Sequence, residues 1–307
     1  MTDGNNGGFS RRETLKCMLW AGTAVVWTVS GGVPSSRLIG SASAADSSFS
    51  FVHISDSHIG FAKPANPDAR ATFNAAIDKI LAMPGKPAFM IHTGDITHTA
   101  QPQQFDDSVE LIRRAKLDVH YAPGEHDILD PKTEAAYLER FGKGAGRGWY
   151  AFDHGGVHFV SLVNVVDLKT NGLGSLGADQ LAWLDDDLRG KSASTPIVVF
   201  AHIPLWMVAP DWGWGTEDSA QALKLLSRFG SVTVLNGHIH QLMQKVEGNV
   251  TFHTARSTAF PQPAPGTAPS PGPKLVPAGE LRKWLGVREV AFSPTATELA
   301  VTDTDLA

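Results

Sequence analysis

Cysteine is almost absent from this sequence, because Cys17 is the only one among 307 residues. A single cysteine excludes an internal disulfide framework, and it also excludes a metal site built from several thiolates. The sequence also lacks an excess of positive charge, because its 26 lysines and arginines are outnumbered by 31 aspartates and glutamates. Nucleic-acid-binding proteins depend on clustered basic side chains, so this balance does not suggest a nucleic-acid partner.

The first 45 residues are typical of an export signal. Arg11 and Arg12 lie in a segment that resembles the twin-arginine signal, an apolar run extends from Cys17 to Val33, and residues 42–44 offer a small-residue cleavage site. We therefore expect residues 1–45 to be read by the twin-arginine export machinery, and the protein to be periplasmic or secreted.

An uncleaved membrane anchor is the alternative interpretation of the same segment. Glycines and a proline in the apolar run weaken it as a spanning helix, so we expect no stable membrane span after removal of the signal.

Residues 46–307 show the pattern of a single α/β domain. Helical spacing of apolar residues recurs in five segments, at 68–82, 103–115, 132–141, 178–188 and 217–229. In the first of these, the apolar residues at helical spacing include Phe73, Ile77, Ile80 and Leu81. Short apolar segments predict strands, at 49–54, 88–91, 117–121, 149–153, 157–163, 197–200, 232–235, 241–246, 250–254, 287–292 and 298–302. The proline-rich stretch 261–277 is expected to be a loop within this domain.

Acidic or histidine side chains follow five of the predicted strands. They are Asp56 with His58, Asp95, Glu125 with His126, His202, and His238 with His240. The carboxyl ends of parallel strands meet at one edge of a sheet, so five such loops can converge on one point. The Asp-x-His and His-x-His spacings let alternate side chains of an extended segment point the same way. Carboxylate and imidazole ligands together favour Fe, Mn or Zn.

The ordered set of these motifs resembles the calcineurin-like metallophosphoesterase superfamily. The motifs are Asp56-Ser57-His58, Gly94-Asp95, Gly124-Glu125-His126-Asp127, His202 and Gly237-His238-Ile239-His240. The resemblance implies a four-layer α/β/β/α sandwich of the metallophosphoesterase type that binds two metal ions.

The resemblance also implies a role for each of these residues. One metal ion would be held by Asp56, His58 and His240, and the second by Glu125, His202 and His238. Asp95 would bridge the two ions. His126 would protonate the leaving group or stabilise the phosphoryl oxygens, and Asp127 would orient it.

These roles imply an exported enzyme that hydrolyses phosphate mono- or diesters by the attack of a metal-bound hydroxide. Within the superfamily, the sequence looks most like the cyclic-nucleotide and glycerophosphodiester phosphodiesterases, or like small purple-acid-like phosphatases. The alternative is a non-catalytic exported protein that binds metal or anions at a degenerate site. The sequence leaves the oligomeric state and the identity of the small phosphoester substrate open.

Glu125 departs from the superfamily pattern, which has asparagine at this position. With Asp56, Asp95 and a bridging hydroxide, Glu125 brings the ligand charge to minus four, which two divalent ions neutralise. This charge would favour an Fe(III)–M(II) pair, or it would disfavour dianionic monoesters relative to monoanionic diesters. Alternatively, Glu125 turns away and leaves a metal position open to water.

Several other side chains have a structural and a functional interpretation. His98 could line the pocket, or it could be an exposed residue near a helix start. Trp206, Trp212 and Trp214 could form an apolar wall for the leaving group, or they could pack onto the sheet. Arg256 could reach a phosphate or could be exposed. His53 and His92 are expected to be core residues, and the acidic run 185–187 to be a solvated helix face.

Overall fold

The computed structural model describes residues 23–30, 33–40, 48–143, 147–295 and 299–307. The chain divides into two compact units, Met1–Asp46 and Ser47–Ala307. In the first unit, β1 (Thr23–Ser30) and β2 (Val33–Gly40) pair as antiparallel strands. Arg11, Arg12 and the small-residue site at 42–44 lie outside the described residues, so the signal peptide stays a prediction. Within the described ranges, no helix has both the length and the apolar character needed to cross a membrane.

The second unit contains two mixed β-sheets. The five-stranded sheet has the order β13 (Ala300–Asp305), β12 (Gly286–Phe292), β3 (Phe49–Ile54), β4 (Met90–His92) and β5 (Val119–Tyr121). The six-stranded sheet has the order β10 (Met243–Glu247), β11 (Val250–Thr254), β9 (Val232–Asn236), β8 (Ile197–Phe200), β7 (Val157–Ser161) and β6 (Tyr150–His154). Strands β3, β4 and β5 run parallel, and so do β7, β8, β9 and β11.

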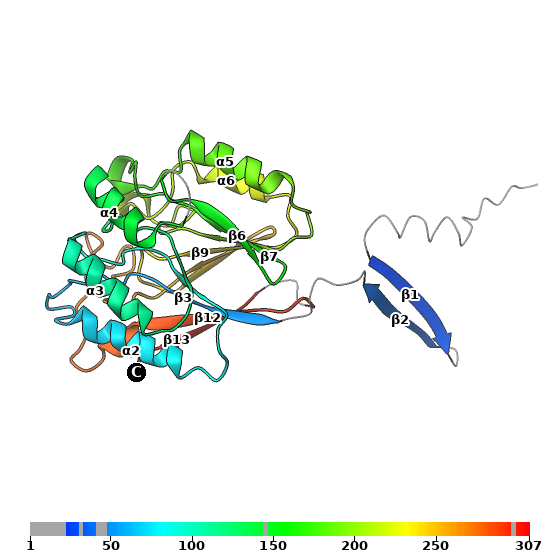
Figure 1. The fold of residues 1–307 in the computed structure, drawn as a ribbon, viewed down its shortest axis with the longest axis horizontal. Helices are drawn as coiled ribbons and strands as arrows, with labels where there is room; N and C mark the ends of the chain where they lie inside the picture. Colours follow the sequence, from blue (N-terminus) through cyan, green and yellow to red (C-terminus); the bar gives the residue numbers. More distant parts are fainter. Residues whose placement is uncertain (1–22, 31–32, 41–47, 144–146, 296–298) are drawn as a thin grey trace, which may run out of the picture. The chain divides into compact units, whose positions relative to one another are not determined.

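The two sheets pack face to face around an apolar layer that includes Phe51, Phe159 and Phe200. The outer face of the five-stranded sheet is covered by α2 (Ala69–Leu81), α3 (Pro102–Arg113), α4 (Pro131–Phe141) and α7 (Leu281–Trp284). The outer face of the six-stranded sheet is covered by α5 (Ala178–Arg189) and α6 (Ser219–Leu226). Figure 1 shows α5 and α6 on one side of the sheets and α2 and α3 on the other. The predicted four-layer α/β/β/α sandwich is therefore confirmed.

Local sequence signals explain where the helices begin. The side chain of Asp68 accepts a hydrogen bond from the Ala71 N–H and caps α2. Pro131 occupies the first turn of α4, where its missing N–H costs nothing. The apolar residues of α2 are not all covered, since Phe73, Ile77 and Ile80 are buried whereas Leu81 is 50% exposed. Leu81 ends the helix, where the next turn that would cover it is absent.

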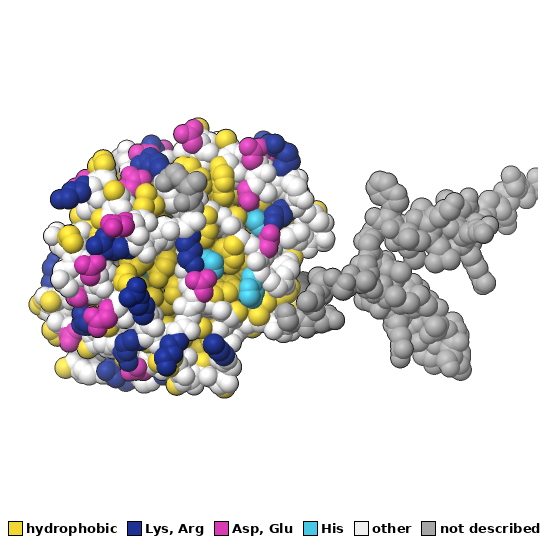
Figure 2. Space-filling model, viewed as in Figure 1, with side chains coloured by type: hydrophobic (Ala, Val, Ile, Leu, Met, Phe, Trp, Pro, Cys, Tyr) yellow, Lys and Arg dark blue, Asp and Glu magenta, His cyan; other side chains and the backbone are white. Residues whose placement is uncertain are grey.

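Charges of both signs are mixed over the molecular surface. On the face that Figure 2 shows, lysine and arginine side chains lie among aspartates and glutamates. Pairs such as Arg140 with Asp106 and Arg114 with Asp78 bring opposite charges together. The acidic run in α5 is only partly a solvated face, because Asp187 reaches the buried ring of His158 at 2.7 Å.

Candidate metal centre

The acidic and histidine side chains that follow the five predicted strands converge in the structure. Asp56 follows β3, Asp95 follows β4 and Glu125 follows β5, all in the five-stranded sheet. His202 follows β8 and His238 follows β9, which are neighbours in the other sheet. The site therefore lies where the carboxyl ends of parallel strands from both sheets meet, as the strand pattern predicted.

The backbone at this site is not extended, which differs from our interpretation of the Asp-x-His and His-x-His spacings. Five of these residues have a left-handed backbone, with φ of 56°, 40°, 51°, 69° and 54° at Asp56, His58, Asp95, His238 and His240. A non-glycine residue in this region costs on the order of 1 kcal/mol or more. Hydrogen bonds between the loops, such as Asp56 N–H to Gly94 O at 2.9 Å, hold these residues in place.

Three of the side chains form a fully buried group that we call the inner cluster: Asp56, His58 and His240. The Nε2 atom of His240 lies 3.1 Å from Oδ1 of Asp56 and 3.3 Å from Nε2 of His58. The Asp56 carboxylate also accepts hydrogen bonds from the His238 N–H, which fixes it against the loop after β9.

A second group, which we call the outer cluster, consists of Glu125, His202 and His238. Glu125 lies between the two imidazoles, with Oε2 at 2.9 Å from His202 Nε2 and Oε1 at 3.0 Å from His238 Nδ1. The side chain of Glu125 is 24% exposed and that of His238 is 11% exposed. Glu125 thus points into the site, and the interpretation in which it turns away is wrong.

One oxygen atom of Asp95 lies between the two clusters. Its Oδ2 is 3.4 Å from His58 Nε2 in the inner cluster and 3.4 Å from His202 Nε2 in the outer cluster. The other oxygen, Oδ1, accepts a hydrogen bond from the His126 N–H at 2.9 Å, which sets the orientation of the carboxylate. Asp95 is therefore the one carboxylate of the set that lies equally close to both clusters.

The spacing of these atoms fits metal coordination. Two ligand atoms that each lie about 2.1 Å from one ion are roughly 3.0 to 3.4 Å apart at octahedral or tetrahedral angles. The distances within each cluster fall near this range. His202 Nε2 and Glu125 Oε2 are buried without a hydrogen-bond partner, although they lie close together. Buried polar atoms of this kind need a partner, and a cation among them would provide it.

Backbone carbonyl groups orient two of the imidazoles toward the clusters. His202 Nδ1 donates to Thr93 O at 2.6 Å, and His240 Nδ1 donates to Phe260 O at 2.5 Å. Because Nδ1 of each ring is bound to a carbonyl oxygen, Nε2 is the atom that faces the carboxylates and is left to bind a metal ion. This arrangement is the usual way in which proteins prepare histidine for metal binding.

The carboxylates of both clusters are held in their charged form. Burial alone raises the pKa of Asp56, but the nearby imidazoles of His240, His202 and His58 outweigh it, and the pKa lies well below the ordinary value. The pKa of Glu125 is also lowered, because His238 and His202 outweigh its burial. Ionised carboxylates enclosed with imidazoles form a donor set for hard or borderline cations such as Fe, Mn or Zn.

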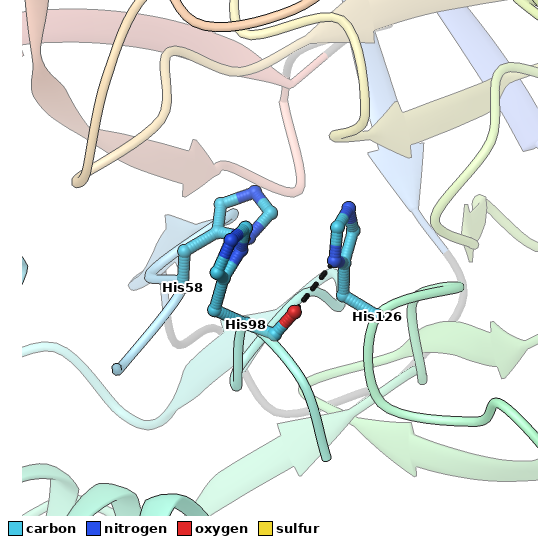
Figure 3. A group of neighbouring side chains, drawn as sticks. All are labelled: His58, His98 and His126. Carbon is cyan, nitrogen blue, oxygen red and sulfur yellow. Dashed lines mark hydrogen bonds between the residues drawn. The ribbon is translucent and has the colours of Figure 1, made fainter. Parts of the chain in front are cut away.

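His126 lies at the mouth of the site beside two other histidines. Figure 3 shows His126 with its Nδ1 directed at the backbone oxygen of His98, to which it donates at 2.7 Å. The rings of His98 and His126 stack at 5.0 Å, and His98 Nδ1 lies 3.3 Å from His58 Nδ1. His98 is therefore part of the site. His98 belongs to none of the motifs, and its place three residues after Asp95 was the one sequence feature that indicated this position.

Asp127 has a different role from the predicted one. Its carboxylate accepts hydrogen bonds from the N–H groups of Ile96, Thr97 and Gly124 at 2.8 to 3.1 Å. Among the described residues it makes no hydrogen bond to the His126 ring. Asp127 therefore ties the loop after β4 to the loop after β5, and it positions His126 only through the backbone.

A cavity of about 400 Å³ opens over the clusters. Trp212, in the short helix η2 (Pro210–Trp212), and Trp214 line it together with Phe260. Trp206 instead packs against Phe252, with ring centroids 5.1 Å apart, so the three tryptophans do not act together. Part of the proline-rich loop also lines the cavity, at Gln262 and residues 271–273, which the sequence did not indicate.

Other residues singled out from the sequence lie elsewhere. Arg256 donates to Lys283 O and is absent from the lining of this cavity. His53 and His92 are fully buried core residues, as predicted, with hydrogen bonds of 2.9 Å to Thr93 Oγ1 and Ser57 Oγ.

The fold also matches a known structure. A dimetal phosphatase from Danio rerio superposes with a TM-score of 0.59 and 15% identity, over 82% of this chain and 98% of that one. At this level of identity the likeness shows a shared fold.

Sequence comparison finds relatives with two kinds of named activity. A serine/threonine-protein phosphatase of Danio rerio is 27% identical over 185 residues, which cover 54% of this chain and 58% of that protein. A probable cyclic nucleotide phosphodiesterase of Synechococcus is 25% identical over 181 residues, which cover 58% of this chain and 68% of that protein. The family model for calcineurin-like phosphoesterases matches residues 49–242, a segment that includes both clusters. This chain therefore belongs to the calcineurin-like phosphoesterase family.

Proposed function

We propose that this protein is an exported phosphoesterase that binds two metal ions, Fe, Mn or Zn, and hydrolyses phosphate mono- or diesters. The observation that carries the proposal is the position of Asp95 Oδ2, 3.4 Å from a histidine of each cluster. Asp95 could therefore serve as a ligand for an ion held by either cluster, as in two-metal hydrolases.

The residues have distinct tasks in this proposal. The inner cluster would hold one ion and the outer cluster would hold the second. Asp95 would be a ligand of both ions. When bound, such ions supply an activated water as nucleophile and positive charge beside the phosphoryl oxygens. His126 holds a proton for the leaving group. Its Nδ1 is fixed by His98 O, so Nε2 is the atom free to transfer that proton.

The named activities of the relatives support both ester classes. Protein phosphatases cleave monoesters and cyclic nucleotide phosphodiesterases cleave diesters, and relatives with each name align with this chain. The substrate is proposed to be small, because the cavity over the clusters measures about 400 Å³.

A panel of aryl phosphate monoesters and bis-aryl phosphodiesters tests this function directly. Wild-type protein should hydrolyse at least one class, and Asp95→Asn should lower kcat by roughly a thousandfold, because both ions lose their shared ligand. Metal analysis of both proteins shows whether the loss follows the ions. Wild-type protein that binds two metal ions but hydrolyses neither class would contradict the proposal and favour the non-catalytic alternative.

We also propose export by the twin-arginine route, supported by Arg11-Arg12, the apolar run and the small residues at 42–44. Replacing both arginines with lysine should keep the protein in the cytoplasm, while the wild-type chain reaches the periplasm or medium. Cell fractionation measures this distribution. Equal export of the two chains would contradict the route.

A further inference from the structure

Glu125 adds a third carboxylate to the centre, beside Asp56 and Asp95. Its two oxygens face His202 and His238 at 2.9 and 3.0 Å, so the charge lies within the outer cluster and not at its edge. Oε2 is buried and makes no hydrogen bond, and the nearest cationic side chain to it is an imidazole, that of His202. The charge of Glu125 therefore acts on whatever anion approaches the outer cluster.

The charge balance of the centre limits the anion that it can accept. Together with the hydroxide that the proposed reaction needs, three carboxylates would supply four negative charges against the four positive charges of two divalent ions, so the centre would be neutral. A neutral centre gives the second charge of a dianion no electrostatic gain, whereas an uncharged residue at position 125 would leave one positive charge, which attracts a dianion more strongly than a monoanion. At an effective dielectric constant of about 20, one unit charge a few ångströms away changes affinity by roughly tenfold or more.

Apart from the proton that His126 holds, the rest of the cavity provides little positive charge. Lys63 is the one lysine or arginine among its described lining residues, and it lies at the exposed rim. Apolar side chains make up another part of the lining, and they include Trp212, Trp214 and Phe260. Such a wall suits an organic substituent, which a phosphodiester carries on two sides and a monoester on one.

We infer that Glu125 makes this a site for monoanionic phosphodiesters in preference to dianionic phosphomonoesters. This inference rests on the proposed function and selects one substrate class within it. It assigns Glu125 the role of a specificity-determining residue in addition to that of a metal ligand.

Binding of two small matched anions at pH 8 tests the inference. Dimethyl phosphate is a monoanion, and methyl phosphate is a dianion there because its second pKa is about 6. Titration calorimetry on the metal-loaded full chain should give a lower Kd for dimethyl phosphate. Glu125→Gln keeps the length and the oxygen atom but removes the charge, and it should shift the ratio of the two Kd values about tenfold toward methyl phosphate. Glu125→Asn should shift it in the same direction.

Asp211→Asn is the matched control, because it removes one negative charge next to Trp212 from an exposed residue outside the cavity lining. It should leave the ratio unchanged. The metal content of each variant is measured as well. If Glu125→Gln and Glu125→Asn have both lost an ion, the ratio of the two Kd values in the wild-type protein tests the inference. A wild-type protein that binds methyl phosphate as tightly as dimethyl phosphate would overturn the inference, and so would an unchanged ratio in a variant that keeps both ions. A trivalent ion at the centre would add a positive charge that attracts the dianion, and the wild-type protein would then bind methyl phosphate and dimethyl phosphate equally.

The two proposals fail in different ways. Wild-type protein that cleaves neither ester class contradicts the proposed function, and the inference falls with it. Wild-type protein that cleaves monoesters as well as diesters, with equal kcat/KM, contradicts only the role of Glu125.

Discussion

The inner and outer clusters differ in how far the fold encloses them. The side chains of Asp56, His58 and His240 are at most 2% exposed, whereas Glu125 is 24% and His238 is 11% exposed. His58 and His240 line the cavity as well, but Glu125 and His238 are the members that solvent reaches most, since His202 of the outer cluster is itself fully buried. We expect from this difference that an inner ion would support the fold more than an outer ion, and that an outer ion would exchange with solvent more readily.

The largest expected effect comes from removing one histidine of each cluster in turn. His240→Ala should lose the inner ion and lower Tm by about 10 °C, because a tightly bound ion contributes roughly 4 kcal/mol to a domain of this size. His238→Ala should lose only the outer ion and change Tm by less than half as much. Calorimetry with metal analysis measures both effects. Equal decreases of Tm in the two variants would show that the more deeply buried cluster does not contribute more to stability.

Stepwise removal of the metal ions with a chelator tests the same difference between the inner and outer clusters. As chelator is added, the exposed outer ion should leave first, so that a form with one ion per chain accumulates and activity disappears before stability does. Metal content, activity and Tm measured on the same samples give the order of loss. Simultaneous departure of both ions at every chelator concentration would contradict it.

A smaller effect is expected at His98, which stacks on His126 above the clusters. His98→Ala should keep both ions and lower kcat about tenfold for esters with poor leaving groups, because His126 loses the ring that orients it. Esters with good leaving groups need little proton transfer and should react almost normally. A uniform decrease for both kinds of ester would indicate a general structural defect.

The smallest expected effect concerns the apolar wall. Trp212→Ala should raise KM for aryl esters by about threefold to tenfold with little change in kcat, because a lining ring is lost. Trp206→Ala is the matched control, since Trp206 packs against Phe252 and not over the cavity. Steady-state kinetics compares the two variants. Similar KM changes in both would mean that the wall does not contact substrate.

The sequence predicted the convergence of Asp56, Asp95 and His202 because each follows a strand, and strand direction alone places such residues at one edge. It could not predict their left-handed backbone, since that conformation is imposed by hydrogen bonds such as Asp56 N–H to Gly94 O between distant loops. The alternation of strands and helices predicted a parallel sheet with crossover helices, and the family resemblance implied the four layers, but neither indicated that Leu81 at the end of α2 is left exposed.

The positions of side chains in loops were the hardest to predict from the sequence. The direction of Glu125 depends on His202 and His238, which come from the other sheet, so local sequence carries no information about it. The separation of Trp206 from Trp212 and the position of Gln262 over the cavity depend on how long loops fold back. Such contacts follow from tertiary structure and not from periodicity or spacing.

Asp95 is the residue proposed to join two metal positions. Anomalous X-ray scattering from crystals of the metal-loaded protein tests it most directly. We expect two peaks, one among Asp56, His58 and His240 and one among Glu125, His202 and His238, both within bonding distance of Asp95. A single peak, or peaks away from Asp95, would contradict the account.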